Sequence, residues 1–179
     1  MGDRAVLHLR NYDNTATFAT FYTHSGGSPV YMLSKTATYL TEESTKASPA
    51  DFAAYFLTHY EDYKLELMEA DSEPGDCEHI WTLRWTRPDW TKHPVPVVTV
   101  KPHGISEHRT WVAATYTGMA EILTATAHAL NEYADNIERV QRENQWSDET
   151  TVKFAGSASA IRAEATGYLV LAAPVGAVA

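Results

Sequence analysis

A chain of 179 residues, 44% hydrophobic and 21% charged, is long enough to bury a core and too apolar to be disordered throughout. Its formal net charge of −9 disfavours general nucleic-acid binding, because an acidic surface repels phosphate and the 14 Lys and Arg residues form no basic run. The single cysteine, Cys77, excludes an intramolecular disulfide and leaves too few thiolates for a zinc site.

The N-terminal residues, Met1 to Arg4, carry no apolar core of the kind found in signal peptides. No stretch of the chain approaches the roughly 18 consecutive apolar residues that a membrane-spanning helix needs. We therefore expect a protein that is not secreted by a signal peptide and that has no membrane partner.

Alternating residues at the start of the chain predict a β-hairpin. Residues 5–10 and 16–23 form its strands, and residues 11–14, rich in Asn and Asp, form its turn. Two helices follow, and each is opened by a Ser-Pro pair that suits the N-cap and the first helical position. The first, from Ser28, has an apolar stripe, and the second, from Ser48, has an aromatic face.

Further strands are expected in the middle of the chain. Residues 65–68 form a short strand, and residues 71–76 form a turn. Residues 79–85 alternate, with three large apolar side chains on one face, and residues 95–100 are rich in β-branched side chains. Prolines before and within the last of these segments indicate an edge strand or an irregular entry.

The second half carries apolar residues spaced alternately four and three apart over about four heptads, the pattern of a coiled-coil-like helix. We assign this long helix to residues 105–145. Within it, we predict that residues 119–143 are helical, with Leu123, Leu130 and Ile137 on one buried face.

The sequence leaves two alternatives for where this helix starts and two for what it packs against. Residues 111–117 are β-branched and aromatic and precede Gly118, so a strand there, with the helix starting near Gly118, is the alternative. The apolar seam packs either on the chain's own sheet or on a partner helix.

The tail, residues 146–179, is rich in Ala, Gly, Val and Ser and carries no charge after Glu164. Residues 151–154 and 168–171 are expected as short strands. We expect an apolar C-terminal arm that packs along the edge of the chain's own sheet or on a partner, because soluble monomers avoid large exposed apolar patches.

Together these elements predict an α+β fold. Residues 1–104 form a domain with an antiparallel sheet of about four or five strands and two helices on one face of it. The long helix follows at residues 105–145, and the arm occupies residues 146–179.

A first candidate ligand site lies at residues 23–29, where two glycines join a strand to a helix. Free N–H groups at a helix N-terminus attract anions, and His24 and Arg4 add donors. No Lys follows the glycines as it would in a P-loop, so a plain strand-to-helix turn is the alternative.

A second candidate lies at residues 75–79, where Asp76 and Glu78 could activate water or bind a divalent ion. A solvated turn with a free thiol is the alternative. The chain has neither an HExxH nor a GxSxG motif, so we assign no catalytic residue, metal ligand or cofactor.

Three segments stand out for their order and spacing: Met1-Gly2-Asp3-Arg4-Ala5, Tyr22-Thr23-His24-Ser25-Gly26-Gly27 and Gly75-Asp76-Cys77-Glu78-His79. They resemble the forms MGDRA, YTHWGG and GDNEH of a group of small, functionally uncharacterised proteins from actinobacteria and their bacteriophages. The resemblance covers residues 1 to about 85, and it departs at Ser25 and Cys77, where Trp and Asn are usual.

The resemblance implies a phage or actinobacterial origin, with the protein in the cytoplasm of the bacterial host or in a virion. It also implies that the polar residues of the three motifs converge on one site. The candidate ligand-binding residues are Arg4, His24, Gly26, Gly27, Ser28, Asp76, Glu78 and His79.

Two functions agree with these patterns. The first is a non-enzymatic, phage-type binding or assembly protein that self-associates or joins a larger protein assembly. The second is a domain that binds or hydrolyses an anionic small molecule or nucleotide, with His24 as donor or base and Arg4 on the anionic group. The candidate interface residues of the first are Met119, Leu123, Leu130, Tyr133, Ile137, Val140, Tyr168, Leu169 and Leu171.

Overall fold

The computed structural model describes residues 4–42, 48–59, 65–87, 93–103, 113–144 and 148–174, and the side chains of all of these except residues 148–154. The described chain contains strands β1 (Ala5–Arg10), β2 (Thr17–Thr23), β3 (Leu65–Met68), β4 (His79–Thr86), β5 (Val95–Pro102) and β6 (Ala114–Thr117). Its helices are α1 (Pro29–Glu42), α2 (Pro49–His59), α3 (Met119–Asn144) and α4 (Asp148–Ala172).

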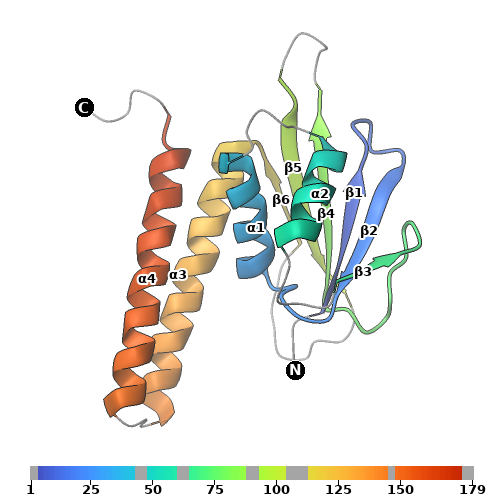
Figure 1. The fold of residues 1–179 in the computed structure, drawn as a ribbon. Helices are drawn as coiled ribbons and strands as arrows, with labels where there is room; N and C mark the ends of the chain where they lie inside the picture. The colour runs from blue at the N-terminus through green and yellow to red at the C-terminus, as the bar shows by residue number, and fades with distance from the viewer. Residues whose placement is uncertain are drawn as a thin grey trace.

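The strands form one mixed sheet in the order β3-β2-β1-β4-β5-β6 (Figure 1). The predicted α+β class is confirmed, but the predicted antiparallel sheet of four or five strands differs in detail, because β1 and β4 pair in parallel. The chain between β1 and β4 includes α1 and α2, which give it the length to return in the same direction. This crossover places a parallel pair at the centre of a sheet whose other neighbours are antiparallel.

Helices α1 and α2 cover one face of the sheet (Figure 1). Leu9 of β1 and Trp81 and Trp85 of β4 are buried beneath them. Tyr39 of α1 meets Phe52 of α2 edge to face, with ring centroids 5.0 Å apart, and its ring also contacts that of Trp85. The apolar stripe and the aromatic face predicted for these two helices are therefore the surfaces that seal the core.

Helix α3 begins after the alternative strand, which is β6. Gly118 at φ +85° turns the chain from β6 into α3, and its N–H donates to the Pro96 carbonyl at 2.8 Å. The predicted helix over residues 119–143 is confirmed, and Leu123 and Leu130 are buried, whereas Ile137 is half-buried. Residues 105–112, the start of the predicted long helix, lie outside the described residues.

The tail is helix α4, not an arm with strands, and this prediction was wrong. Helix α4 folds back on α3 as an antiparallel hairpin, the outermost layer in Figure 1. Ala165 and Tyr168 pack with Leu123, Leu130 and the α1 residue Ala37. Small side chains let the two helices approach closely, and that contact outweighs the β propensity of the Val and Tyr residues in the tail. Residues 175–179 lie outside the described residues.

Leu130→Ala should lower the free energy of unfolding by about 2–5 kcal/mol, because it removes a side chain that is 4% exposed and leaves a cavity between α3 and α4. Urea unfolding followed by circular dichroism measures this change. Leu57→Ala is the matched control, since Leu57 is 58% exposed and its truncation should have little effect. Equal losses in the two variants would contradict the described packing.

Candidate functional site

Part of the predicted ligand site does come together, at the end of the sheet where β1 and β4 begin and β2 ends. Arg4 Nη1 donates to Asp76 Oδ2 at 2.6 Å, and Tyr22 Oη donates to the same oxygen at 3.0 Å. The hydrogen bond from Tyr22 and the charge of Arg4 lower the pKa of Asp76 below its ordinary value. Arg4 and Asp76 remain about half exposed.

His24 and Glu78 lie next to this pair. The His24 ring stands edge-on to the Tyr22 ring, with centroids 4.8 Å apart, and His24 Nε2 contacts Glu66 Oε1 at 2.8 Å. The Glu78 N–H donates to the Arg4 carbonyl at 2.8 Å. Arg4, His24, Asp76 and Glu78 are thus neighbours, as we predicted from the three sequence motifs.

The other candidate residues face the interior of the protein. Gly26, Gly27 and Ser28 are buried, and the Trp81 indole Nε1 donates to the Gly27 carbonyl at 3.0 Å. The glycine segment therefore serves as a packed strand-to-helix turn, and the N-terminus of α1 presents no open surface to an anion. His79 pairs in register with Ala5, so it faces α1 and α2 on the opposite side of the sheet from Tyr22.

The polar side chains of this cluster mainly stabilise the fold by contacting one another. Two of the side chains that the sequence predicted as ligand donors already contact carboxylates: Arg4 contacts Asp76, and His24 contacts Glu66. Cys77 is 1% exposed, and burial raises the pKa of its thiol to about 11, so the thiol stays protonated at neutral pH. The described residues contain no group of three His, Cys, Asp or Glu placed to hold a metal ion.

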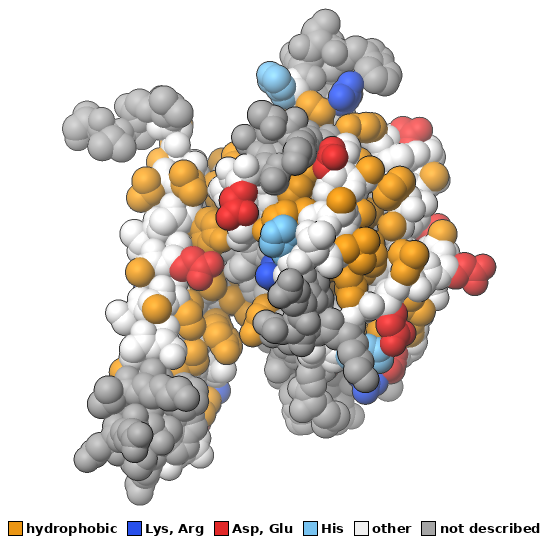
Figure 2. Space-filling view, viewed as in Figure 1, with side chains coloured by type: hydrophobic (Ala, Val, Ile, Leu, Met, Phe, Trp, Pro, Cys, Tyr) orange, Lys and Arg blue, Asp and Glu red, His pale blue; other side chains and the backbone are white. Residues whose placement is uncertain are grey.

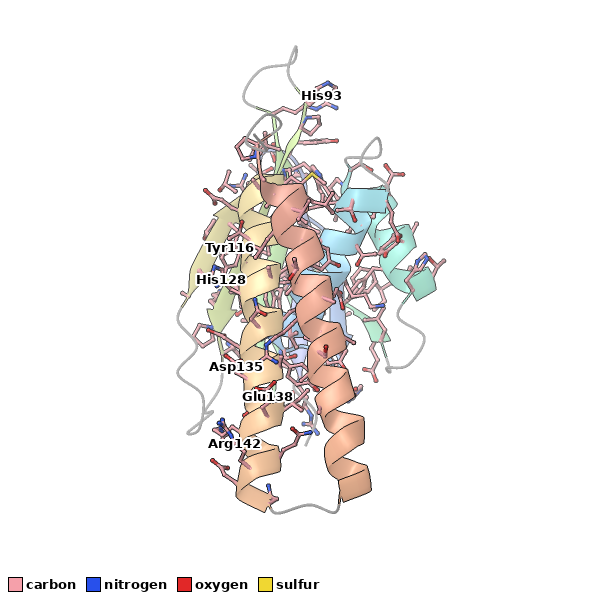
Figure 3. All side chains as sticks on the ribbon, turned by 90° about the vertical axis from the view of Figure 1, so that its left-hand side faces the viewer. His93, Tyr116, His128, Asp135, Glu138 and Arg142 are labelled. Carbon is pink, nitrogen blue, oxygen red and sulfur yellow. The ribbon has the colours of Figure 1, made fainter. Side chains whose placement is uncertain are left out.

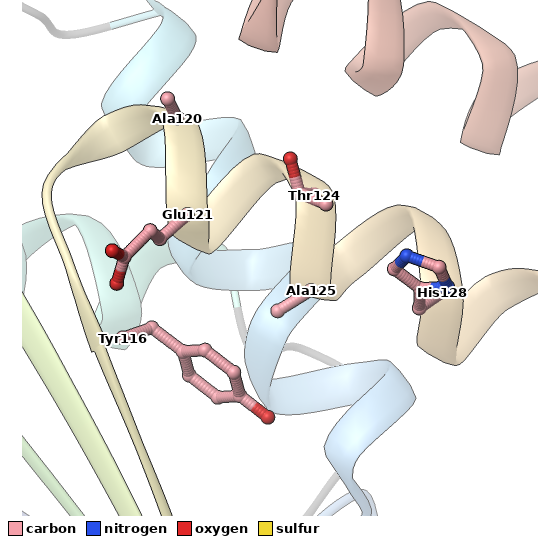
Figure 4. Close-up of a pocket in the computed structure, with 6 residues that line it drawn as sticks. All are labelled: Tyr116, Ala120, Glu121, Thr124, Ala125 and His128. Carbon is pink, nitrogen blue, oxygen red and sulfur yellow. The ribbon is translucent and has the colours of Figure 1, made fainter.

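An open groove of about 380 Å³ lies between β6 and α3 (Figure 4). Tyr116 lies along its floor, and burial raises the pKa of this phenol, which stays a hydrogen-bond donor at neutral pH. The carboxylate of Glu121 accepts a hydrogen bond from the Thr117 N–H at 2.7 Å, and His128 lies at the far end of the groove. Glu121 is therefore engaged in capping α3, and the groove holds no convergent pair of reactive groups.

The outer face of α4 carries Leu169 and Leu171, which we predicted as interface residues, but on a helix that we did not predict. Between residues 155 and 174, all of which are described, Glu164 is the single charged residue among the exposed positions. Leu169, Val170 and Leu171 are 43%, 67% and 60% exposed. Figure 2 accordingly shows the edge formed by α4 as mainly hydrophobic and uncharged side chains.

The exposed positions of helix α3 carry many more charged residues than those of α4. Half of its exposed residues are charged. Figure 3 shows the charged side chains of Asp135, Glu138 and Arg142 along α3, and the first two pair with Arg162 of α4. A helix exposed to water normally carries such charges on its outer side. The sequence signal that could have revealed the α4 face is the scarcity of charge after residue 154, read on a helix rather than on strands.

The predicted interface residues divide between two environments. Leu123, Leu130 and Tyr168 are buried between α1, α3 and α4, so they stabilise the chain's own fold. Ile137 and Val140 are half-buried on α3. The members that are exposed are Met119, Tyr133, Leu169 and Leu171.

Comparisons of the chain with protein-family models, with curated proteins and with solved structures find no match. Among the described helices, none combines the length and the apolar character needed to cross a membrane.

Asp76→Asn should lower the thermal midpoint at neutral pH, because it removes the charge that Tyr22 and Arg4 stabilise. The folded-state pKa of Asp76 lies below the ordinary 3.8, so its contribution is complete above that value and is lost as the pH falls through the folded-state pKa. The difference in thermal midpoint between the wild type and Asp76→Asn should therefore become smaller as the pH of the melts is lowered from neutral to about pH 2.

Tyr22→Phe provides the control for this prediction. Added to Asp76→Asn, it should lower the midpoint less than it does alone, because both changes remove the same hydrogen bond. A gap between wild type and Asp76→Asn that stays constant with pH would show that the carboxylate contributes nothing through its charge.

Proposed function

We propose that this chain is an assembly protein, in which the α+β domain holds the α3–α4 hairpin and the outer face of α4 binds another protein subunit. The observation that carries the proposal is the outer face itself, which exposes Leu169, Val170 and Leu171 and carries one charge, Glu164, among its described exposed positions. Neighbouring apolar side chains exposed on the surface of a protein often mark a site that binds another protein.

The energetics favour a covered face. Burying a Val or Leu side chain fully is worth about 1.5–3 kcal/mol relative to leaving it in water. Three such side chains stand within one turn of α4, and all of them are exposed in the isolated chain. A partner that covers them gains part of this free energy and meets one charged side chain, Glu164, among the described exposed positions of residues 155–174.

The hairpin is also held firmly enough to present that face. Arg162 of α4 pairs with Asp135 at 2.6 Å and with Glu138, both on α3. Tyr168 Oη and the α1 residue Thr38 lie within hydrogen-bond distance, at 3.1 Å, which ties α4 to the domain. A surface that is already ordered loses little conformational entropy when it binds.

The setting that we propose is a virion or another oligomeric assembly of a phage or its bacterial host. Its support is the resemblance of residues 1 to about 85 to proteins of actinobacteria and their bacteriophages. The alternative, a binding or hydrolytic site at the N-terminal cluster, has less support because Arg4 and His24 are paired with carboxylates and the glycine turn is buried.

Light scattering of the full-length chain, combined with a thermal-shift screen against nucleotides and divalent ions, tests the proposal. We expect a mass above that of the monomer at micromolar concentration, because the α4 face drives association, and no shift of the melting midpoint with any of these ligands. A monomer whose midpoint rises with a nucleotide or a metal ion would contradict the proposal and favour the ligand site.

A further inference from the structure

A histidine is buried on the face of the sheet opposite α1 and α2. His8 of β1 is 1% exposed, and it pairs in register with Thr20 of β2 and with Thr82 of β4. The imidazole is the side chain whose charge normally changes near neutral pH, and burial disfavours its charged form. The proposed assembly function does not involve this residue, which is both titratable and enclosed.

The connection between β3 and β4, residues 69–78, lies over this histidine, and we call it the covering turn. Asp71 Oδ1 accepts a hydrogen bond from Arg10 Nη2 at 2.9 Å. Glu73 Oε1 lies 3.5 Å from Lys101 Nζ and 3.6 Å from Nε2 of the histidine. The covering turn is thus held to the sheet by polar contacts that surround the imidazole ring.

A short chain of hydrogen bonds decides where the neutral ring carries its proton. The Asp71 N–H donates to Thr20 Oγ1 at 3.2 Å, and Thr20 Oγ1 lies 3.0 Å from His8 Nδ1. Nδ1 is the acceptor that the Thr20 hydroxyl reaches among the described residues, so this hydroxyl donates to Nδ1. The ring proton is then on Nε2, which is buried and makes no hydrogen bond with a described residue.

A second proton on the ring is incompatible with this chain of hydrogen bonds. Nδ1 would become a donor, and the Thr20 hydroxyl would have to accept from it as well as from the Asp71 N–H. The hydroxyl hydrogen would then lose its acceptor, although Thr20 is 0% exposed. The closed covering turn therefore fits a neutral His8 and not a charged one.

The charged groups that face His8 act in both directions. The carboxylates of Glu73 and Asp71 favour its protonation, whereas the guanidinium of Arg10 disfavours it. Lys101 of β5 pairs with Glu73, and the neighbour on β4 is the uncharged Thr82. Burial is the largest effect, and it lowers the pKa of His8 below the ordinary value of 6.5 in spite of the two carboxylates.

We propose that His8 is an acid-sensitive latch, which holds the covering turn on the sheet while the ring is neutral and releases the turn when the ring gains a proton. Release would uncover the apolar residues beneath the turn, which are Val6, Tyr22, Cys77 and Ile80. This inference is independent of the proposed assembly function.

The direction of the effect follows from proton binding. In the open state His8 meets water and regains a pKa near 6.5, whereas in the closed state its pKa is lower. The state that binds protons more tightly gains population as the pH falls. The closed turn is therefore fully stabilised above 6.5 and loses stability as the pH falls from 6.5 toward the closed-state pKa.

Thiol labelling of the full-length chain measures the opening, because Cys77 is the single cysteine, lies in the covering turn and is 1% exposed. Dithiodipyridine reacts with thiols at acidic as well as neutral pH. Dividing its rate by that for free cysteine at the same pH corrects for the chemistry of the thiol. From neutral pH to about pH 5, the corrected rate should rise by about fivefold or more, with a limit of about thirtyfold set by the open-state pKa.

His8→Asn should abolish this rise. The amide oxygen can accept the hydrogen bond from the Thr20 hydroxyl in place of Nδ1, and the side chain cannot become charged. His128→Asn is the matched control, because it removes an exposed histidine on α3 and should leave the rise unchanged. Circular dichroism and the melting midpoint check that both variants stay folded.

Nuclear magnetic resonance of the ring nitrogens tests the latch in the wild-type chain and needs no variant. At neutral pH, Nε2 of His8 should carry the proton and Nδ1 should not. A titration of the folded chain should give His8 a pKa below 6.5. This measurement, together with the wild-type labelling rates, decides the matter if His8→Asn does not fold.

The inference is overturned if the corrected labelling rate of the wild type stays constant as the pH falls. A rate that decreases would also overturn it, since a charged His8 would then hold Glu73 more tightly. An equal rise in the wild type and in His8→Asn would assign the pH dependence to another group. A folded-state pKa of His8 at or above 6.5 would be equally incompatible with the latch.

Discussion

The packing of α4 on α3 determines which side chains of this molecule are buried and which are exposed to solvent. Ala165 and Tyr168 fill the apolar seam of α3, together with the α1 residue Ala37, so the residues that resembled a free coiled-coil seam become internal. The same contact fixes the rotation of α4 about its own axis. It turns the small and apolar side chains on the other side of α4 toward solvent.

The sequence predicted α3 well and missed α4, for one physical reason. Leu123 and Leu130 stand out because charged residues separate them, so the helical period is visible. In α4, small and apolar residues occupy both faces, and no contrast reveals a period. The β-branched and aromatic residues at 168–171 then favour a strand by propensity, which tertiary packing overrides. The parallel pairing of β1 with β4 is likewise non-local, and no short pattern encodes it.

The N-terminal cluster shows a similar division. The prediction that Arg4, His24 and Asp76 lie together is confirmed, because Tyr22 contacts both His24 and Asp76 and Arg4 pairs with Asp76. They did not predict that Ser28 and His79 are buried, since burial depends on α1 and on the strand register. The ion pair of Arg4 with Asp76 and the hydrogen bond from the Glu78 N–H to the Arg4 carbonyl tie the start of β1 to the segment before β4, and so this corner supports the sheet that α1 covers.

The central claim is that the outer face of α4 is covered in solution, and amide hydrogen exchange at high and low protein concentration tests it most directly. The amides of residues 155–172 should exchange more slowly at high concentration, because association that covers the outer face of α4 suppresses its local opening, while those of β1 should stay unchanged. Exchange in α4 that does not depend on protein concentration would contradict the account.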